Sequence, residues 1–189
     1  PRTKRVYRIK SQENKEVNGF WICDLGRYGY SYLDQNRLEK IIAARKEIGK
    51  ELKWENAVLF IIEKIKKLLY TKKTSQLALV LHTWLSNEEL FLLRKIFKDD
   101  LKVEKIYIVD SKQGEADGFL LTSERSPNRR GAQEMGFDLK PLSLEELAGE
   151  TEILLVFGSF LSEHFSLTDI RNALQRIETK VLFTSQKND

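Results

Sequence analysis

The feature that most constrains this chain is a strand–helix–strand pattern in the middle of the sequence. Residues 77–81 (Leu-Ala-Leu-Val-Leu) form a continuous apolar run, which is typical of a parallel strand buried on both faces. A segment with helical periodicity follows from about Asn87 to Phe97, and residues 105–110 form a second strand-like run. Because parallel strands need a crossover between them, residues 77–110 predict one β-α-β unit.

The same pattern returns near the end of the sequence. Residues 153–157 and 180–183 are strand-like, and residues 166–177 between them are helical in pattern. Another amphipathic helix is predicted over residues 54–69, and the sequence Ser86-Asn87-Glu88-Glu89 predicts a capping box at a helix start. Two β-α-β units predict an α/β fold class, a Rossmann-like three-layer domain with a mostly parallel sheet.

The first part of the chain has a different pattern. Residues 6–9 alternate apolar and basic side chains, and the aromatic run 20–22 follows a polar turn, which together predict a small β-hairpin segment. Residues 26–38 form a connector rich in tyrosine and glycine. We therefore predict a β-rich segment over residues 1–38 and the Rossmann-like domain over residues 39–189.

Composition excludes several classes of protein. The 32 basic and 28 acidic residues leave a net charge of +4, which is too small to require nucleic acid or an anionic membrane as partner. The single cysteine, Cys23, excludes an internal disulfide and any cluster held only by cysteines of this sequence. No apolar run reaches the roughly 18 residues of a membrane span. Since the sequence opens on strand-like alternation without an initiator Met, we interpret it as a fragment of a longer polypeptide.

Residues that could carry chemistry follow the predicted strands. His82 and His164 each lie shortly after a strand, where open sheets place their ligands. No Gly-rich dinucleotide fingerprint or Walker sequence occurs in the chain. The turn at residues 126–132, which holds Arg129 and Arg130, could cradle a phosphate or simply start a short helix.

Four blocks of the sequence carry a resemblance to a known family. The first is Val17-Asn18-Gly19-Phe20-Trp21-Ile22-Cys23-Asp24-Leu25-Gly26-Arg27-Tyr28-Gly29-Tyr30, which is followed by Asn36-Arg37-Leu38. The others are Trp54-Glu55-Asn56-Ala57, Ser86-Asn87-Glu88-Glu89 and Asn128-Arg129-Arg130-Gly131-Ala132. The first block resembles the end of the iron–sulfur segment in the molybdopterin oxidoreductase superfamily. More narrowly, the order of the blocks is similar to the large iron–sulfur subunit of bacterial NADH-quinone oxidoreductase, which lies in the peripheral arm of respiratory complex I. The resemblance extends from about Lys4 to Ser185.

The resemblance implies specific roles for a few residues. Cys23 matches the last of four cysteine ligands of a 4Fe-4S cluster, whose other three ligands would lie upstream in the parent chain. As an alternative, Cys23 is a small hydrophobic residue of a core. Asn128, Arg130 and Gly131 match a cofactor loop, which would be vestigial here or would bind pterin phosphate. No catalytic residue is expected in this chain.

One departure from the family pattern concerns the pterin. Molybdopterin enzymes have a lysine two residues after the cluster cysteine, where this chain has Leu25, which argues against a molybdopterin cofactor. The resemblance therefore implies a piece of an iron–sulfur electron-transfer subunit that passes electrons from NADH toward quinone. The parent would be an oxidoreductase, and this piece alone would be inactive. Its partners would be the other peripheral-arm subunits, with no nucleic acid and with membrane contact only through partner subunits. It would lie in the cytoplasm at the inner membrane of a bacterium.

Two other functions stay open from the sequence. One is a molybdopterin-dependent oxidoreductase such as formate dehydrogenase, with the loop 128–131 and the neighbouring Arg125 holding the pterin phosphates. The other is a nucleic-acid or protein-binding module on a two-stranded ribbon. It would use the basic residues near the start of the chain together with Tyr7, namely Arg2, Lys4, Arg5, Arg8 and Lys10.

Overall fold

The computed structural model describes residues 5–43, 52–139, 141–158 and 161–186. The chain divides into two compact units. The N-terminal unit comprises the described parts of 1–38, 113–125 and 185–189, and the α/β unit comprises those of 39–112 and 126–184. Within the described ranges, each helix is too short or too polar to cross a membrane.

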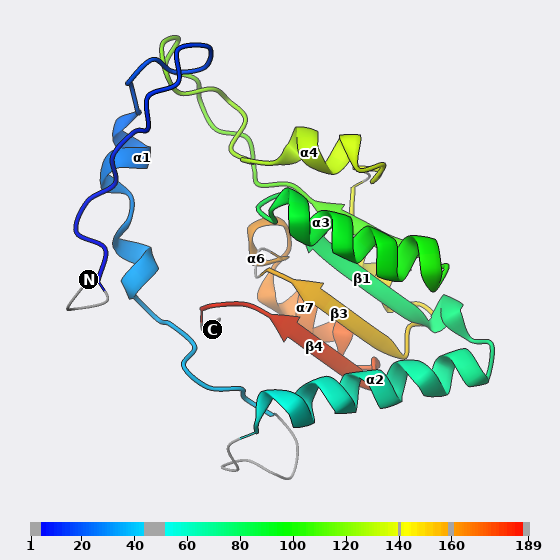
Figure 1. Cartoon of the computed structure of the whole chain (residues 1–189). Coiled ribbons are helices and arrows are strands. Elements are labelled where there is room, and N and C mark those ends of the chain that lie inside the picture. The colour runs from blue at the N-terminus through cyan, green and yellow to red at the C-terminus, as the bar shows by residue number, and fades with distance from the viewer. Residues whose placement is uncertain (1–4, 44–51, 140, 159–160, 187–189) are drawn as a thin grey trace. The chain divides into compact units, whose positions relative to one another are not determined.

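The α/β unit is built on a four-stranded parallel sheet. Its strands are β1 (Leu77–His82), β2 (Lys105–Val109), β3 (Ile153–Phe157) and β4 (Thr179–Phe183), in the spatial order β2-β1-β3-β4. Every neighbouring pair is parallel, with Leu81 opposite Ile108 and Leu155 opposite Val181. All six residues of β1 are buried, because the strand has neighbours on both sides and helices on both faces (Figure 1). The predicted α/β fold class is confirmed.

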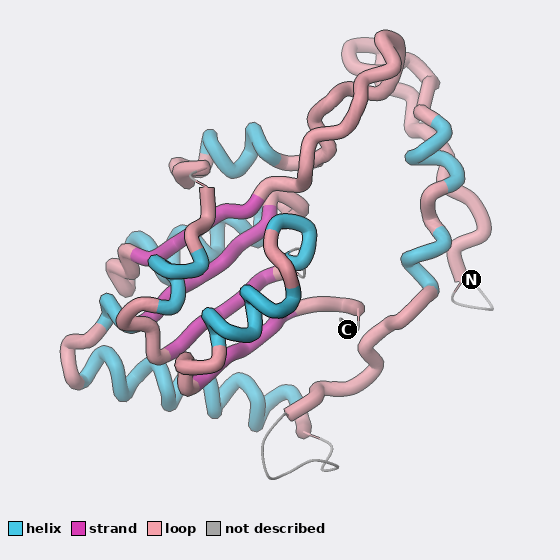
Figure 2. Tube along the Cα trace, turned by 180° about the vertical axis from the view of Figure 1, so that it is seen from behind, coloured by secondary structure: helices cyan, strands magenta, loops and turns pink. Residues whose placement is uncertain are grey.

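Helices cover both faces of this sheet. One face packs against α2 (Trp54–Tyr70), α3 (Asn87–Leu93), the π-helical segment η3 (Arg94–Asp100) and α4 (Arg129–Glu134). The other face packs against residues of α5 (Leu144–Ala148) and α7 (Leu167–Leu174), which lie in front of the sheet in Figure 2. Successive residues of a strand point to opposite faces, so Leu79 and Leu81 join the first layer while Ala78 and Val80 join the second. Two short helices, η2 (Thr74–Gln76) and α6 (Leu161–His164), complete the unit among the described residues.

The start of α3 has the predicted capping box. The Glu89 backbone N–H donates to Ser86 Oγ at 3.2 Å, and the Ser86 backbone N–H donates to Glu89 Oε2 at 2.8 Å. This arrangement satisfies N–H groups that the helix itself leaves without partners. The helix continues past the predicted end at Phe97, because η3 extends it to Asp100 with the wider π-helical turn.

The N-terminal unit differs from the prediction. Residues 6–9 and 20–22 form no strand in the described structure, and the predicted β-hairpin is reduced to one antiparallel bridge between Asn14 and Gly19. The Asn18 side chain donates to Gln12 O and Trp21 O at 3.2 and 3.0 Å. The Tyr30 hydroxyl donates to Tyr7 O at 2.8 Å.

Side chains thus bind the backbone oxygens of Tyr7 and Trp21, which lie in the predicted strands, and the strand assignment was wrong. In place of strands the unit has the helices α1 (Asp24–Tyr28) and η1 (Ser31–Asp34).

Candidate functional site

The polar side chains of the α/β unit gather at the carboxyl edge of its sheet. His82 ends β1, Asp110 follows β2 and Gly158 follows β3. The chain order reverses between β1 and β3, since β1 leads outward to β2 while β3 leads outward to β4. A crevice at such a reversal is the usual ligand position of open α/β sheets. This edge is therefore the candidate position of a ligand site in the α/β unit.

His82 is held there as a neutral side chain. It is only 2% exposed, and the Trp84 backbone N–H donates to its Nδ1 at 3.1 Å. Because Nδ1 accepts, the ring carries its proton on Nε2. Burial lowers the pKa of His82 to about 4, while Asp110 opposes this shift and His164 adds to it. The sequence placed His82 at this edge correctly, and the structure shows a buried neutral imidazole.

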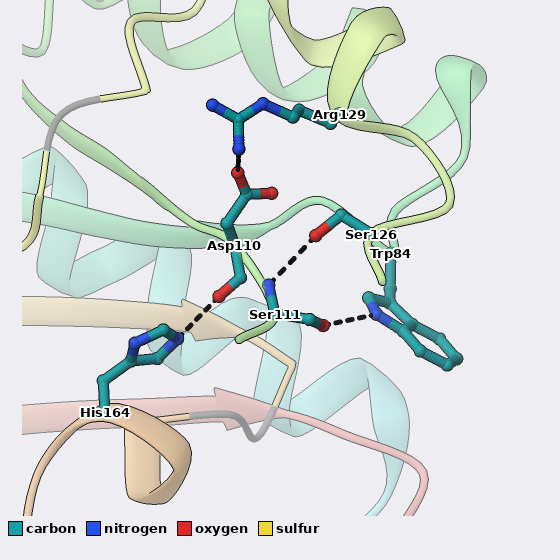
Figure 3. A network of polar contacts seen from close by, with 6 residues as sticks. All are labelled: Trp84, Asp110, Ser111, Ser126, Arg129 and His164. Carbon is teal, nitrogen blue, oxygen red and sulfur yellow. Dashed lines mark hydrogen bonds and ion pairs between the residues drawn. The ribbon is translucent and has the colours of Figure 1, made fainter. Parts of the chain in front are cut away.

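Asp110 is the centre of the polar network in Figure 3. The guanidinium of Arg129, at the start of α4, forms an ion pair with Asp110 Oδ2. His164 in α6 lies with its Nε2 2.6 Å from the Asp110 backbone oxygen. The two histidines singled out by the sequence thus lie at the same edge of the sheet, His82 at the end of β1 and His164 against the residue that follows β2. Asp110 and Arg129 lie at this edge as well.

Ser111 connects this network to two further loops. Its backbone N–H donates to Ser126 Oγ at 3.0 Å, and its own Oγ accepts from the Trp84 indole at 2.9 Å. Sequence reasoning did not assign Asp110 or Ser111. An acidic residue directly after a buried strand was the available signal, because that position in doubly wound folds meets a ligand.

The loop residues proposed to bind a cofactor make contacts within the chain. The Asn128 side-chain amide donates to Leu85 O at 2.8 Å and to Asn87 Oδ1 at 3.0 Å. A Cβ atom on Gly131 would overlap the amide oxygens of Asn128 and Asn87. The Arg130 side chain is 91% exposed and lies 3.8 Å from Glu134. The Asn128 amide thus connects the start of α4 to the start of α3, Gly131 leaves room for this contact, and Arg130 is exposed to solvent.

Among the described residues of this edge, the cavity next to His82 is small. A cavity of about 10 Å³ lies among His82, Val109, Gly158 and Leu161, with apolar residues completing its walls. This is about the room of one water molecule, whereas ligand pockets commonly offer about 300 Å³ or more. With Asn128 and Gly131 engaged internally, the residues present do not fit a pterin phosphate, and we derive no chemistry through that group.

Cys23 lies in the N-terminal unit, directly before α1. It is half-buried, and its Sγ accepts from the Gly26 backbone N–H at 3.4 Å. Leu25, which stands where the family has lysine, is 61% exposed. Among the described residues, no three His, Cys, Asp or Glu side chains gather closely enough to hold a metal. A metal at Cys23 would therefore need further ligands from outside the described residues.

Comparisons with known proteins bear on the family. No protein-family model matches the chain. Over 66 residues, 35% of this chain and 8% of the relative, it is 39% identical to NADH-quinone oxidoreductase subunit 3 of Thermus thermophilus. Over 92 residues, 48% of this chain and 9% of the relative, it is 27% identical to probable oxidoreductase YjgC of Bacillus subtilis. Each match thus spans less than a tenth of the relative. Over part of its length the chain is thus similar to two proteins that are named as oxidoreductases.

Proposed function

We propose that this chain is part of the large iron–sulfur electron-transfer subunit of an NADH-quinone oxidoreductase. Cys23 would be one of four thiolate ligands of a 4Fe-4S cluster, and the other three would come from outside these residues, since the sequence has one cysteine. The cluster would supply one-electron transfer. The α/β unit would act as scaffold, and the partners would be other peripheral-arm subunits of complex I.

The observation that carries this proposal is the setting of Cys23. Cys23 is half-buried, and its Sγ accepts a hydrogen bond from the Gly26 backbone N–H. Such N–H···S hydrogen bonds stabilise the negative charge of a ligating thiolate and tune the reduction potential of a cluster. A Cβ on Gly26 would lie 3.1 Å from the Ile22 side chain and 3.6 Å from Cys23 Sγ. A Cβ atom there would thus be in van der Waals contact with the sulfur, and the Ile22 side chain would have to shift slightly.

The surroundings of Cys23 suit a cluster that is covered in a larger protein. Leu25 and Tyr28 of α1 are 61% and 69% exposed, and Trp21 is 53% exposed. Trp21 also meets Phe119 edge to face, with ring centroids 6.1 Å apart. Exposed apolar groups of this kind commonly mark surfaces that another protein segment covers. The apolar shell around a cluster excludes water and thereby sets its potential.

The two alternative functions receive less support from the described residues. A molybdopterin enzyme would need the loop 128–131 for phosphate, but Asn128 and Gly131 pack against Asn87. A nucleic-acid module would need a two-stranded ribbon carrying Arg8 and Lys10, and residues 6–9 form no strand. Arg2 and Lys4 lie outside the described residues. The described residues therefore support a cluster-ligand role of Cys23 better than either alternative.

Iron analysis of the longer polypeptide containing this sequence tests the proposal. The protein would be purified without oxygen, and iron, acid-labile sulfide, molybdenum, tungsten and pterin would be measured per chain. We expect iron and sulfide without molybdenum, tungsten or pterin. Cys23→Ala should lose about four iron atoms per chain, one 4Fe-4S cluster.

The matched control is Ile22→Val, which changes the neighbouring side chain and keeps the sulfur. It should retain all of the iron, and circular dichroism would establish that both variants are folded. Unchanged iron in Cys23→Ala would refute the ligand role. Molybdenum or tungsten with stoichiometric pterin would instead favour the formate dehydrogenase-like alternative.

A further inference from the structure

The carboxyl edge of the sheet contains the two elements with which doubly wound folds bind nucleotides. In such folds the helix start after the first strand receives the phosphates, and an acidic residue after the second strand receives the ribose hydroxyls. Here α3 follows β1, and Asp110 directly follows β2. Both elements are engaged by other parts of the same chain.

The acidic residue is engaged by Arg129. The Arg129 guanidinium forms an ion pair with Asp110 Oδ2, and the two side chains are 36% and 21% exposed. His164 approaches the backbone oxygen of Asp110 from α6 at 2.6 Å. A guanidinium on a carboxylate is a strong charge-assisted contact, so a ribose diol would have to compete with a cation for this acceptor.

The start of α3 is engaged as well. Ser86 and Glu89 form its capping box, in which the Ser86 and Glu89 backbone N–H groups each donate to the side chain of the other residue. Asn128 also binds the loop between β1 and α3. Its backbone N–H donates to Thr83 O at 3.0 Å, and its side chain donates to Leu85 O at 2.8 Å. The loop that would wrap a phosphate is therefore tied to the start of α4.

We propose that Arg129 is an internal occupant that closes this edge of the sheet to nucleotides. Its guanidinium takes the carboxylate that a ribose would need, and the segment that carries it ties the loops after β1 and β2 together. The inference concerns the α/β unit and does not depend on the role of Cys23.

Among the described residues, few hydrogen-bonding groups at this edge are left without a partner. Asp110 Oδ1 and Thr83 Oγ1 are buried without a hydrogen-bond partner among the described residues, and the cavity beside His82 measures about 10 Å³. These groups could bind about one water. A nucleotide would need Arg129 and its loop to move away first.

Nucleotide titration of the 189-residue chain tests the closure. ADP and GDP would be added to 1 mM to ¹⁵N-labelled protein, and amide shifts followed by NMR. We expect no saturable shift at Trp84, Ser111 or Asn128. A dissociation constant below 1 mM with shifts centred on those amides would overturn the proposal.

Variants of Arg129 test its part as a positioning residue. Arg129→Ala should speed amide exchange at Ser111 and Asn128 at least tenfold, because these amides donate to Ser126 Oγ and Thr83 O across the joined loops. It should also raise the pKa of His82, since the Asp110 carboxylate would lose its cation. Arg129→Lys keeps a point charge and should give an intermediate result, and it serves as the test if the alanine variant does not fold.

The matched control is Arg130→Ala, because the Arg130 side chain is 91% exposed one residue away. It should leave both exchange rates and the His82 titration unchanged. If Arg129→Ala behaves like this control in both measurements, Arg129 does not hold the edge closed and the proposal is wrong.

Discussion

Replacing Gly131 with alanine should destabilise the α/β unit, although alanine is the better helix former. Gly131 lies inside α4 without a positive φ, so its backbone alone would favour alanine by about 1 kcal/mol. A Cβ atom there would overlap the amide oxygens of Asn128 and Asn87. Moving them apart would cost the two hydrogen bonds of the Asn128 amide, at about 1 kcal/mol each, together with about 1 kcal/mol or more of overpacking.

Together these contributions lower the free energy of unfolding by about 2 kcal/mol, which corresponds to a decrease in Tm of about 4–8 °C for a chain of this size. Urea unfolding followed by circular dichroism would measure the loss. The matched control Gln133→Ala alters an exposed position of the same helix and should change stability by less than about 0.5 kcal/mol. In an Asn87→Ala, Asn128→Ala background the Gly131 substitution should instead be neutral or stabilising.

A neutral or stabilising Gly131→Ala in the unaltered chain would refute this reasoning. It would mean that the glycine does not serve internal packing, and a role in the close approach of a cofactor would become the better explanation. The prediction therefore separates a structural from a cofactor-binding origin of the Asn-Arg-Arg-Gly-Ala block.

Three further predictions concern the α/β unit. Ser86→Ala should lower the free energy of unfolding by about 1 kcal/mol because it removes the cap of α3; a change below about 0.2 kcal/mol in urea unfolding would be inconsistent with the capping box. Leu79→Ala should cost about 2–5 kcal/mol, since Leu79 is 0% exposed in the central strand, and a thermal melt that matches the parent protein would contradict that core. His82 has a folded pKa of about 4, below its ordinary 6.5, so the unfolded chain binds the proton more tightly. The contribution of neutral His82 to the free energy of unfolding is therefore complete above pH 6.5, and it falls by about 3 kcal/mol as pH drops toward 4. His82→Gln should remove this part of the pH dependence of stability, and identical stability-against-pH profiles for both proteins would disprove the prediction.

Much of the α/β unit could be predicted from the sequence because its signals are local. The apolar run before His82 has the composition of a strand buried on both faces, and β1 lies in the middle of the sheet. The capping box follows from Ser86 and Glu89 alone, three residues apart. These elements depend on residues that are close in the sequence and on the pattern of apolar side chains, and both can be read from the sequence.

The site and the N-terminal unit depend on contacts between distant residues. Asp110 and Arg129 are 19 positions apart, and nothing in the spacing of the sequence indicates that they pair. The alternation at residues 6–9 is typical of a strand, but a strand needs a partner, and side chains such as Tyr30 bind that backbone instead. Asn128 and Gly131 were recognised as a block, and their contacts within the chain become visible only in the fold.

The most direct test of the central claim is electron paramagnetic resonance of the dithionite-reduced longer polypeptide, with and without Cys23→Ala. Spin quantification gives the number of reduced clusters per chain, and redox titration separates them by potential. If Cys23 is a cluster ligand, the variant should lose the signal of one 4Fe-4S cluster while any others keep their potentials. A spectrum identical to that of the unaltered protein would contradict the proposal that Cys23 holds a cluster.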